Sequence, residues 1–387
     1  MTYNFDEVIN RKNTHSVKWD GLETYFGNGD LLPMWVADMD FRTPPFVMKA
    51  LRQCLDHEVL GYPSAYPEWG QAIVQWLQRR HQWCVSEEML TFVPGVVRGQ
   101  AFALQCFTQP GDKVLVMSPV YHPFFLVTEK MGREVVRCPL CLEEGQYKID
   151  FDCFRQTIKG CKLFILCNPH NPGGRVWSKA ELEQIARICH ENGTMVISDE
   201  IHADLTFPPY KHLPFPSVCR EAEQISLTFM APSKAFNMPG LASSYAVTVD
   251  EDIRMRFQSF MEAGEFDWSH TLATVGTIAA YQEGDEWLDE MLAYVQGNID
   301  YLEAYLKTYL PQIGIIRPQA SYLVYLDCRA LNLSQEELVR LFIDKARLAL
   351  NDGSMFGPEG KGFMRLNVGC PRSLLEQALQ QLTEALR

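Results

Sequence analysis

Short apolar runs alternate with amphipathic stretches through the middle of the chain, and this alternation predicts the fold. Strand-like runs fall at residues 90–93, 113–117, 134–138, 163–167, 195–198, 225–230 and 245–249. Most are separated by helical spacing of apolar residues, and one such stretch begins with a capping box at Ser178 and Glu181 and ends at Asn192-Gly193. Continuous apolar strands between helices indicate an α/β fold with a mostly parallel seven-stranded sheet covered on both faces.

The two ends of the chain show other patterns. Residues 1–45 are irregular and include an apolar, strand-like piece at 32–41, which we expect to pack on another part of the protein. Helical spacing follows at 46–55 and 69–83, with a break at Gly61-Tyr62-Pro63. After residue 281, long helical segments, short strands at 321–326 and 362–367 and a second capping box at Ser334 predict a smaller α+β lobe. We therefore expect an N-terminal segment (1–45), a large domain (46–281) and a small C-terminal domain (282–387).

Length and charge narrow the classes of function. A chain of 387 residues exceeds what one hydrophobic core usually serves, which agrees with two lobes. The net charge is −13, from 35 basic and 48 acidic residues, so nucleic acid and anionic membranes are not expected partners and a small organic substrate is favoured. The amino terminus is polar, and no apolar run is long enough to span a membrane. We expect a cytoplasmic protein without a signal peptide.

The twelve cysteines do not form a recognisable framework. They are scattered, and several lie within apolar runs, as Cys167 does, which is typical of buried reduced thiols. Cys138 and Cys141 have the spacing of a redox pair or of half a zinc site, but no second pair completes four ligands, and we expect neither role. We expect no metal.

Candidate chemistry gathers at the ends of the predicted strands. The side chains concerned follow four different strands and are Lys234, Asp199, Asn171 and Tyr121. Taken alone, three of these residues have common structural explanations. Lys234 could be a solvated loop lysine, Asp199 a helix cap and Tyr121 a core or interface residue. Because the carboxyl ends of parallel strands meet at one edge, we expect the four to converge. An amine, a carboxylate, an amide and an aromatic ring are what pyridoxal phosphate requires.

Four motifs carry a family resemblance across essentially the whole chain. They are Asn168-Pro-His-Asn-Pro-Gly-Gly, Ser198-Asp-Glu-Ile-His, Ala231-Pro-Ser-Lys-Ala-Phe-Asn and Phe363-Met-Arg-Leu-Asn-Val-Gly-Cys-Pro-Arg. Together they resemble fold-type-I pyridoxal-phosphate enzymes of the aminotransferase class I/II superfamily, and within it the cystathionine β-lyase group of C–S lyases, of the MalY–PatB type. The resemblance implies the fold-type-I transferase fold, with a large sheet domain and a smaller C-terminal domain.

The resemblance also implies roles for individual residues. Lys234 would form the imine with the cofactor, and Asp199 would face the pyridine nitrogen. Asn171 would bond the phenolic oxygen, Tyr121 would stack on the ring, and both would also contact the substrate. Arg365 would grip the substrate carboxylate.

The phosphate group of the cofactor would lie at the start of a helix. The loop with Gly95, Val96 and Val97 precedes an apolar helix, whose first backbone N–H groups suit an anion. In the family a tyrosine from Gly-Tyr-Pro, here Tyr62, reaches the neighbouring subunit's phosphate. The resemblance therefore implies a homodimer, with the N-terminal segment packing on both the small domain and the partner.

Three positions depart from the wider superfamily. Ala231 stands where Ser or Thr is frequent, so Ser233 is a candidate for the phosphate hydroxyl, and Ala242 replaces an arginine. His202 stands where many aminotransferases have tyrosine, which favours the lyase group. We expect His202 to contact the cofactor region as a hydrogen-bonding residue, in preference to a proton shuttle.

The prediction is therefore a cysteine-S-conjugate β-lyase that converts S-substituted cysteines to thiol, pyruvate and ammonia. An aminotransferase on the same scaffold is the first alternative, because the site residues are shared. A regulatory protein that binds a transcription factor through the surface of the fold is the second. A regulatory interaction would survive the loss of Lys234, whereas either enzyme would not.

Overall fold

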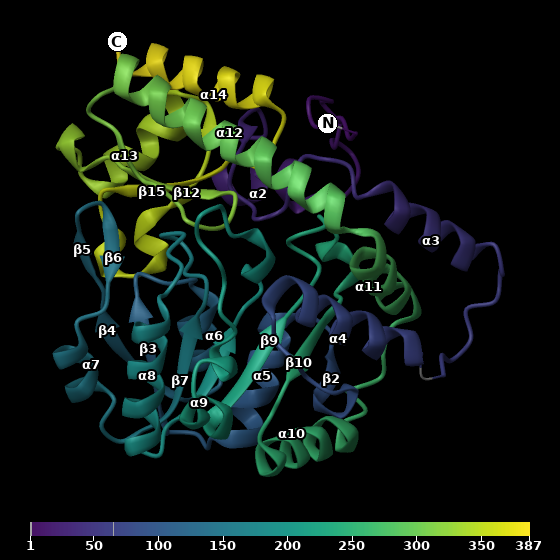
Figure 1. The fold of residues 1–387 in the computed structure, drawn as a ribbon. Helices are drawn as coiled ribbons and strands as arrows, with labels where there is room; N and C mark the ends of the chain where they lie inside the picture. The colour runs from purple at the N-terminus through teal and green to yellow at the C-terminus, as the bar shows by residue number, and fades with distance from the viewer. Residues whose placement is uncertain (1, 65) are drawn as a thin grey trace.

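The computed structural model describes residues 2–64 and 66–387, and a seven-stranded sheet lies at its centre (Figure 1). Its strands, in spatial order, are β2 (Leu90–Val93), β10 (Ser244–Val247), β9 (Ser226–Met230), β8 (Met195–Asp199), β7 (Cys161–Cys167), β3 (Lys113–Ser118) and β4 (Glu134–Pro139). Only β10 runs antiparallel to its neighbours. The predicted α/β fold with a mostly parallel seven-stranded sheet is confirmed.

Helices cover both faces of this sheet, and successive residues of a strand point to opposite faces. One face packs on α5 (Val96–Phe107), α6 (Pro123–Lys130) and α10 (Glu251–Ala263). The other packs on α7 (Phe151–Thr157), α8 (Lys179–Glu191) and α9 (Arg220–Ile225), and farther along on α4 (Pro67–His81) and α11 (Thr271–Glu283). Val114 and Val116 point to the first face and Leu115 to the second. Burial on both sides explains why these strands are continuously apolar.

A four-stranded antiparallel sheet forms the core of the C-terminal part. Its strands, in spatial order, are β11 (Gly314–Ile316), β12 (Leu323–Asp327), β15 (Phe363–Asn367) and β14 (Asn351–Asp352). The long helix α12 (Asp285–Tyr309) and α14 (Arg372–Ala385) lie above it in Figure 1, and α13 (Gln335–Arg340) begins with the predicted capping box at Ser334. The sequence predicted β12 and β15, whereas β11 and β14 are too short to show a period. The domain boundaries stay a prediction.

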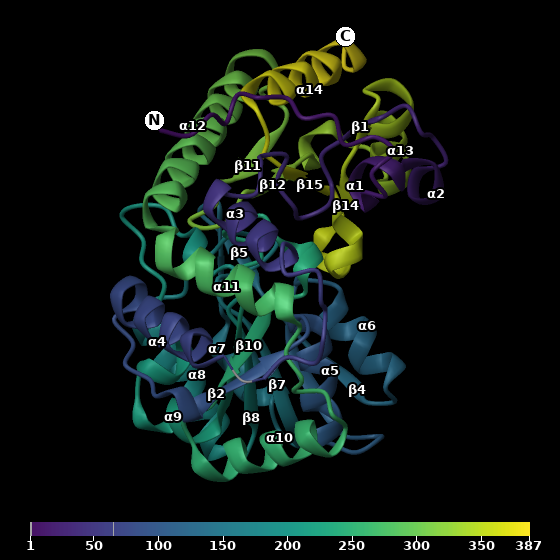
Figure 2. The ribbon, with the colours of Figure 1, turned by 90° about the vertical axis from the view of Figure 1, so that its right-hand side faces the viewer.

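The N-terminal segment runs along the small sheet (Figure 2). It contains α1 (Val17–Asp20), α2 (Leu22–Phe26) and β1 (Leu32–Pro33), and β1 pairs in parallel with β13 (Leu348–Ala349). Beyond β1 the predicted strand at 32–41 is wrong, because residues 34–41 form no ladder. Side chains satisfy their carbonyls instead, and we call residues 35–41 the strap. The strap carbonyls that accept side-chain hydrogen bonds are those of Trp35, Val36, Ala37, Asp38, Met39 and Phe41.

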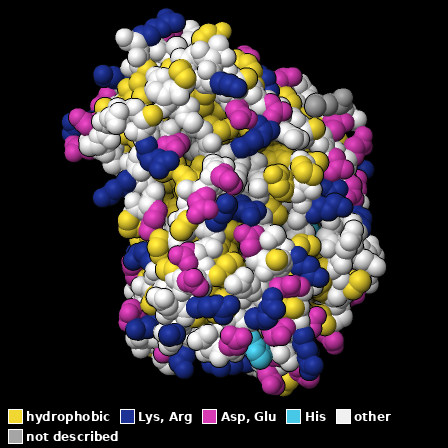
Figure 3. Space-filling view, turned by 60° about the vertical axis from the view of Figure 1, so that its left-hand side comes forward, with side chains coloured by type: hydrophobic (Ala, Val, Ile, Leu, Met, Phe, Trp, Pro, Cys, Tyr) yellow, Lys and Arg dark blue, Asp and Glu magenta, His cyan; other side chains and the backbone are white. Residues whose placement is uncertain are grey.

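The remaining elements complete the envelope. Helix α3 (Pro45–Leu55) follows the strap, and β5 (Cys141–Glu143) pairs with β6 (Gln146–Lys148) in a hairpin. On the face drawn in Figure 3, acidic and basic side chains are interspersed and form no continuous basic patch. No helix in the described part of the chain is long and apolar enough to cross a membrane.

Candidate active site

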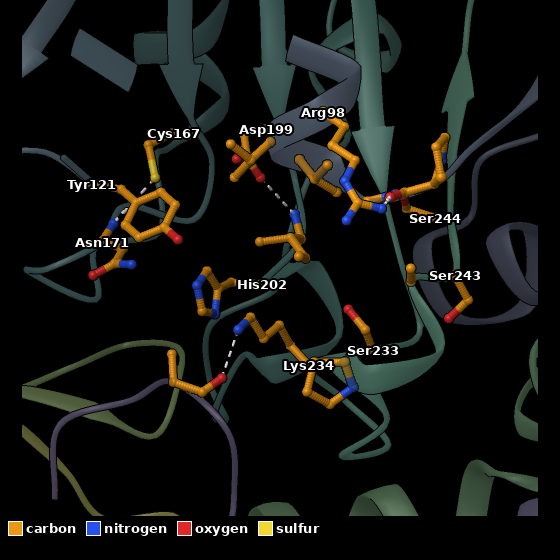
Figure 4. Close-up of a pocket in the computed structure, with 18 residues that line it drawn as sticks. Arg98, Tyr121, Cys167, Asn171, Asp199, His202, Ser233, Lys234, Ser243 and Ser244 are labelled. Atoms are coloured by element: carbon orange, nitrogen blue, oxygen red, sulfur yellow. Dashed lines mark hydrogen bonds between the residues drawn. The ribbon is translucent and has the colours of Figure 1, made fainter. Parts of the chain in front are cut away.

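A cavity of about 270 Å³ opens at the carboxyl edge of the large sheet (Figure 4). It brings together most of the predicted site residues, namely Gly95, Val96, Val97, Tyr121, Asn171, Asp199, His202, Ser233 and Lys234. Arg365 lies one hydrogen bond away from the cavity wall, whereas Tyr62 lies elsewhere. In Figure 4, Lys234 faces Asp199 and Tyr121 across the cavity, with Ser233 and Ser243 at the other end.

Lys234 lies in the turn after β9, and its amine is enclosed by protein at the cavity wall. Its Nζ donates a hydrogen bond to the carbonyl oxygen of Ala37 in the strap at 2.6 Å. No carboxylate in the described residues lies within salt-bridge distance of this amine. Burial lowers the pKa of Lys234 to about 8, against a smaller opposing effect of Asp38. The amine is therefore available as a nucleophile or base near neutral pH.

Asp199 is the last residue of β8 and is buried at the cavity floor. Its carboxylate accepts hydrogen bonds from Gln100 Nε2 at 2.7 Å and from the backbone N–H of Ile201 at 3.1 Å. Burial raises its pKa to about 7. Sequence reasoning missed Gln100, and its only signal was a polar residue within the apolar helix α5. A buried carboxylate without a cationic partner among the described residues suits a ligand that brings a protonated ring nitrogen.

The opposite end of the cavity is suited to an anion. Gly95 precedes α5 with φ of +116°, a conformation that favours glycine. No side chain among the described residues caps the first N–H groups of this helix. The Ser244 hydroxyl accepts from the backbone N–H of Gly95 and donates to Val93, so it is committed to the loop. The hydroxyl of Ser243 is buried and has no partner among the described residues. Ser233 and Ser243 are thus the hydroxyls available to a phosphate.

Ser243 escaped sequence reasoning because only the carboxyl ends of strands were considered. β10 runs antiparallel, so its amino end lies at the same edge as the carboxyl ends of its neighbours. Ser243 immediately precedes that end. A prediction that β10 is antiparallel would have found it.

Arg365 lies in β15, buried, with no carboxylate in contact among the described residues. Its guanidinium donates to Asn171 Oδ1 at 3.1 Å, to Asn351 Oδ1 at 2.6 Å and to the carbonyl of Trp35 at 3.1 Å. Its Nε is buried without a partner, and burial lowers its pKa to about 10. A buried cation surrounded by neutral acceptors is suited to an incoming carboxylate. Asn351 and the Trp35 carbonyl, which accept these bonds, have no signal in the sequence.

Three further predicted residues take different positions. Tyr121 lines the cavity, and burial raises the pKa of its hydroxyl, which therefore stays protonated at neutral pH. His202 also lines it; burial lowers the pKa of its ring to about 3, and its Nδ1 has no partner among the described residues. Its expected hydrogen bond stays a prediction. Tyr62 is 93% exposed and packs edge-on against Trp268 on the surface of its own chain.

Comparison with known proteins gives matches along the chain. The model of the family described as aminotransferase class I and II matches residues 30–382. Cystathionine beta-lyase PatB of Bacillus subtilis is 43% identical, covering 99% of this chain and all of that protein. The structure is similar to that of cystalysin of Treponema denticola, which contains pyridoxal 5′-phosphate, with a TM-score of 0.96, 34% identity and coverage of 100% of this chain and 99% of that one. It is also similar to a PLP-bound C–S lyase of Staphylococcus hominis, with a TM-score of 0.92, 34% identity and coverage of 99% of this chain and 98% of that one.

Proposed function

The chain belongs to the aminotransferase class I and II family, and from that premise we propose that it is a pyridoxal-phosphate-dependent cysteine-S-conjugate β-lyase. Its substrates would be S-substituted cysteines, and its products a thiol, pyruvate and ammonia. The observation that carries the proposal is the 43% identity with a cystathionine β-lyase over the full length of both chains. The cavity supports it, because it holds a low-pKa lysine opposite a buried carboxylate.

The cavity residues fit pyridoxal phosphate. Lys234 would bond it covalently, Asp199 would face its ring nitrogen, Asn171 its phenolic oxygen and Tyr121 its ring. The helix start at Gly95, Val96 and Val97, with Ser233 and Ser243, would hold its phosphate. The free hydroxyl of Ser243 and the uncapped helix are the features of this chain that call for an anion there. When bound, the cofactor supplies an electron sink for the negative charge that develops at the substrate Cα.

The chain's own residues would orient the substrate and move its proton. Arg365 would take the substrate carboxylate through its buried guanidinium, which fixes the Cα–H bond relative to Lys234. The neutral Lys234 amine would then accept the Cα proton at Nζ. Asp199 would hold the positive charge of the ring nitrogen in place by charge pairing in a dry site. Cleavage of the Cβ–S bond would release the sulfur as a thiolate, which takes up a proton to give the thiol. The released aminoacrylate would then be hydrolysed by one water molecule to pyruvate and ammonia.

Elimination is favoured over transamination by the position of His202. It stands where many aminotransferases carry a tyrosine, within the Asp-Glu-Ile-His motif typical of the lyase group. A direct test compares L-cystathionine with L-2-aminobutyrate, which has the same backbone but no leaving group on Cβ. We expect pyruvate from cystathionine without any 2-oxo acid, and from 2-aminobutyrate only exchange of the Cα proton with solvent deuterium. Absence of pyruvate from every thioether amino acid tested would contradict the proposal.

We further propose a homodimer with shared sites, located in the cytoplasm. Tyr62 is accompanied on the surface by exposed apolar residues, among them Val59, Leu60 and Trp268, as expected of a surface covered by a partner. This would bring Tyr62 to the phosphate of the neighbouring subunit. All twelve cysteines are free, which supports a reducing compartment.

A further inference from the structure

Two donors share the carbonyl oxygen of Ala37, and one of them is Lys234. The Lys234 amine donates at 2.6 Å and the hydroxyl of Tyr322 at 3.0 Å. Tyr322 directly precedes β12 and is only 1% exposed. Burial raises the pKa of its hydroxyl, so it stays protonated at neutral pH and remains a donor. A carbonyl oxygen has two lone pairs, and this one uses both.

The strap holds the Ala37 carbonyl in a fixed position. On one side, Asn367 Nδ2 donates to the carbonyls of Val36 and Asp38 at 2.6 and 2.7 Å. On the other, Asn237 Nδ2 donates to the carbonyls of Met39 and Phe41. Its neighbours on both sides are therefore bound by side chains of β15 and of the turn after β9, and these bonds hold the Ala37 carbonyl beside the amine.

From this geometry we propose that Tyr322 is a positioning residue for Lys234. The Tyr322 hydroxyl occupies one lone pair of the Ala37 carbonyl, so the Lys234 amine has only the other lone pair as acceptor, and that acceptor is weakened. The remaining bond orients the amine without holding it as an ammonium ion. This inference rests on the proposed function, in which Lys234 is a base. While Lys234 is bonded to the cofactor it cannot donate to Ala37, and the Tyr322 hydroxyl then keeps the buried carbonyl satisfied. When the amine is released, the acceptor is already in place.

The charged groups around the Lys234 amine do not orient it as the Ala37 carbonyl does. Asp38 and Asp199 favour the ammonium form and Arg365 disfavours it, while the neutral ring of His202 lines the same cavity. None of these groups forms a salt bridge or a hydrogen bond with Lys234. Removing the Tyr322 hydroxyl leaves both lone pairs of the carbonyl to the amine. Since the ammonium form donates more strongly, the amine pKa should then rise by about half a unit to one unit.

The test compares Tyr322→Phe with Tyr325→Phe. Tyr325 is a matched control, because it lies in β12, is equally buried and donates its hydroxyl to a backbone carbonyl, that of Gly353, at 3.2 Å. The full-length chain freed of cofactor is acetylated briefly at a series of pH values, and the extent of labelling at Lys234 is read by mass spectrometry. We expect the titration midpoint of Lys234 to rise in Tyr322→Phe and to stay at the wild-type value in Tyr325→Phe.

Steady-state kinetics of the loaded enzyme give a second measurement. For Tyr322→Phe we expect kcat at pH 7 to fall about three- to tenfold, while KM stays within twofold of the wild-type value. The wild-type kcat should be recovered above pH 9, because the pKa of Lys234 would have risen by about half a unit to one unit. A wild-type labelling midpoint in Tyr322→Phe, or an equal shift in Tyr325→Phe, would overturn the proposal. Because labelling needs no turnover, this outcome is separate from any failure of the lyase assignment.

Discussion

Arg365 Nη1 donates a hydrogen bond to Asn171 Oδ1 at 3.1 Å, which joins the four-stranded sheet to the turn after β7. The bond settles which end of the Asn171 amide is used, because its oxygen is occupied. The Nδ2 group is left as the donor, which is what the phenolic oxygen of the proposed cofactor needs. The residue that would bind the substrate thus also orients a residue that would bind the cofactor.

Replacing Arg365 by lysine should therefore impair substrate binding although the charge is kept. Lysine offers a point charge and cannot reach Asn171, Asn351 and a carboxylate together. We expect kcat/KM for a thioether amino acid to fall by about 10²- to 10³-fold, mainly through KM, as is usual when a buried charge contact is truncated. Arg329→Lys, at an exposed ion pair with Asp327, is the control and should leave kinetics unchanged. Equal kinetics in the two variants would exclude Arg365 as the carboxylate site.

Asp199 should destabilise the protein when no cofactor is bound. Burial raises its pKa from 3.8 to about 7. Below about pH 4 the carboxyl is protonated in both the folded and the unfolded chain, so it costs no stability; stability falls as the pH rises, and the loss is complete above pH 7. Lys234 has the opposite pH dependence, because burial lowers its pKa from 10.5 to about 8. The stability that its neutral form allows at high pH is lost as the pH falls through 8 and the buried amine becomes charged. These two groups together should make the cofactor-free protein least stable near pH 7–8.

The Asp199→Asn variant tests both effects of this carboxylate, the lower stability of the cofactor-free protein and the contribution to catalysis. At pH 8 we expect it to raise the free energy of unfolding of the cofactor-free protein by about 1–3 kcal/mol, because the charge penalty disappears. The same variant should lose several orders of magnitude in kcat. Urea unfolding measures the first effect, with the exposed Asp344→Asn as control. Destabilisation by Asp199→Asn at pH 8 would show that the carboxylate is not strained in the empty site.

Lys234→Ala should abolish both covalent attachment of the cofactor and turnover. Lys234 is the lysine that lines the cavity, and the exposed Lys211→Ala serves as control. Borohydride reduction of the loaded wild-type protein, followed by peptide mapping, should place the pyridoxyl group on Lys234. A label on any other lysine would contradict the assignment.

The cross-subunit role of Tyr62 can be tested by mixing inactive subunits. Tyr62→Ala and Lys234→Ala homodimers should each be impaired, since each lacks one part of every site. In a mixed dimer, one site would combine an intact Lys234 with an intact Tyr62 from the neighbour. We expect activity to reappear on mixing under conditions that exchange subunits. No recovery, despite proven exchange, would mean that Tyr62 acts within its own chain or not at all.

Sequence alone predicted the large sheet and the residues at its carboxyl edge, because burial on both faces makes those strands continuously apolar. It failed where structure depends on side-chain donors far away in the chain. The strap is as apolar as a strand, yet Asn237 and Asn367 bind its carbonyls, and neither contact leaves a local pattern. Ser243 was missed for a topological reason, because the spacing of apolar residues in a strand does not show whether the strand runs parallel or antiparallel to its neighbours. Gln100 and Asn351 support site residues from other elements and likewise show no local signal.

The stoichiometry of the reaction shows whether this site catalyses β-elimination. Purified loaded protein is incubated with excess L-cystathionine and no 2-oxo acid, and pyruvate and free thiol are measured over many turnovers. The lyase assignment predicts one pyruvate for each thiol, accumulating well beyond one equivalent per site. Product formation that stalls after one equivalent and resumes only when 2-oxoglutarate is added would contradict it and establish an aminotransferase.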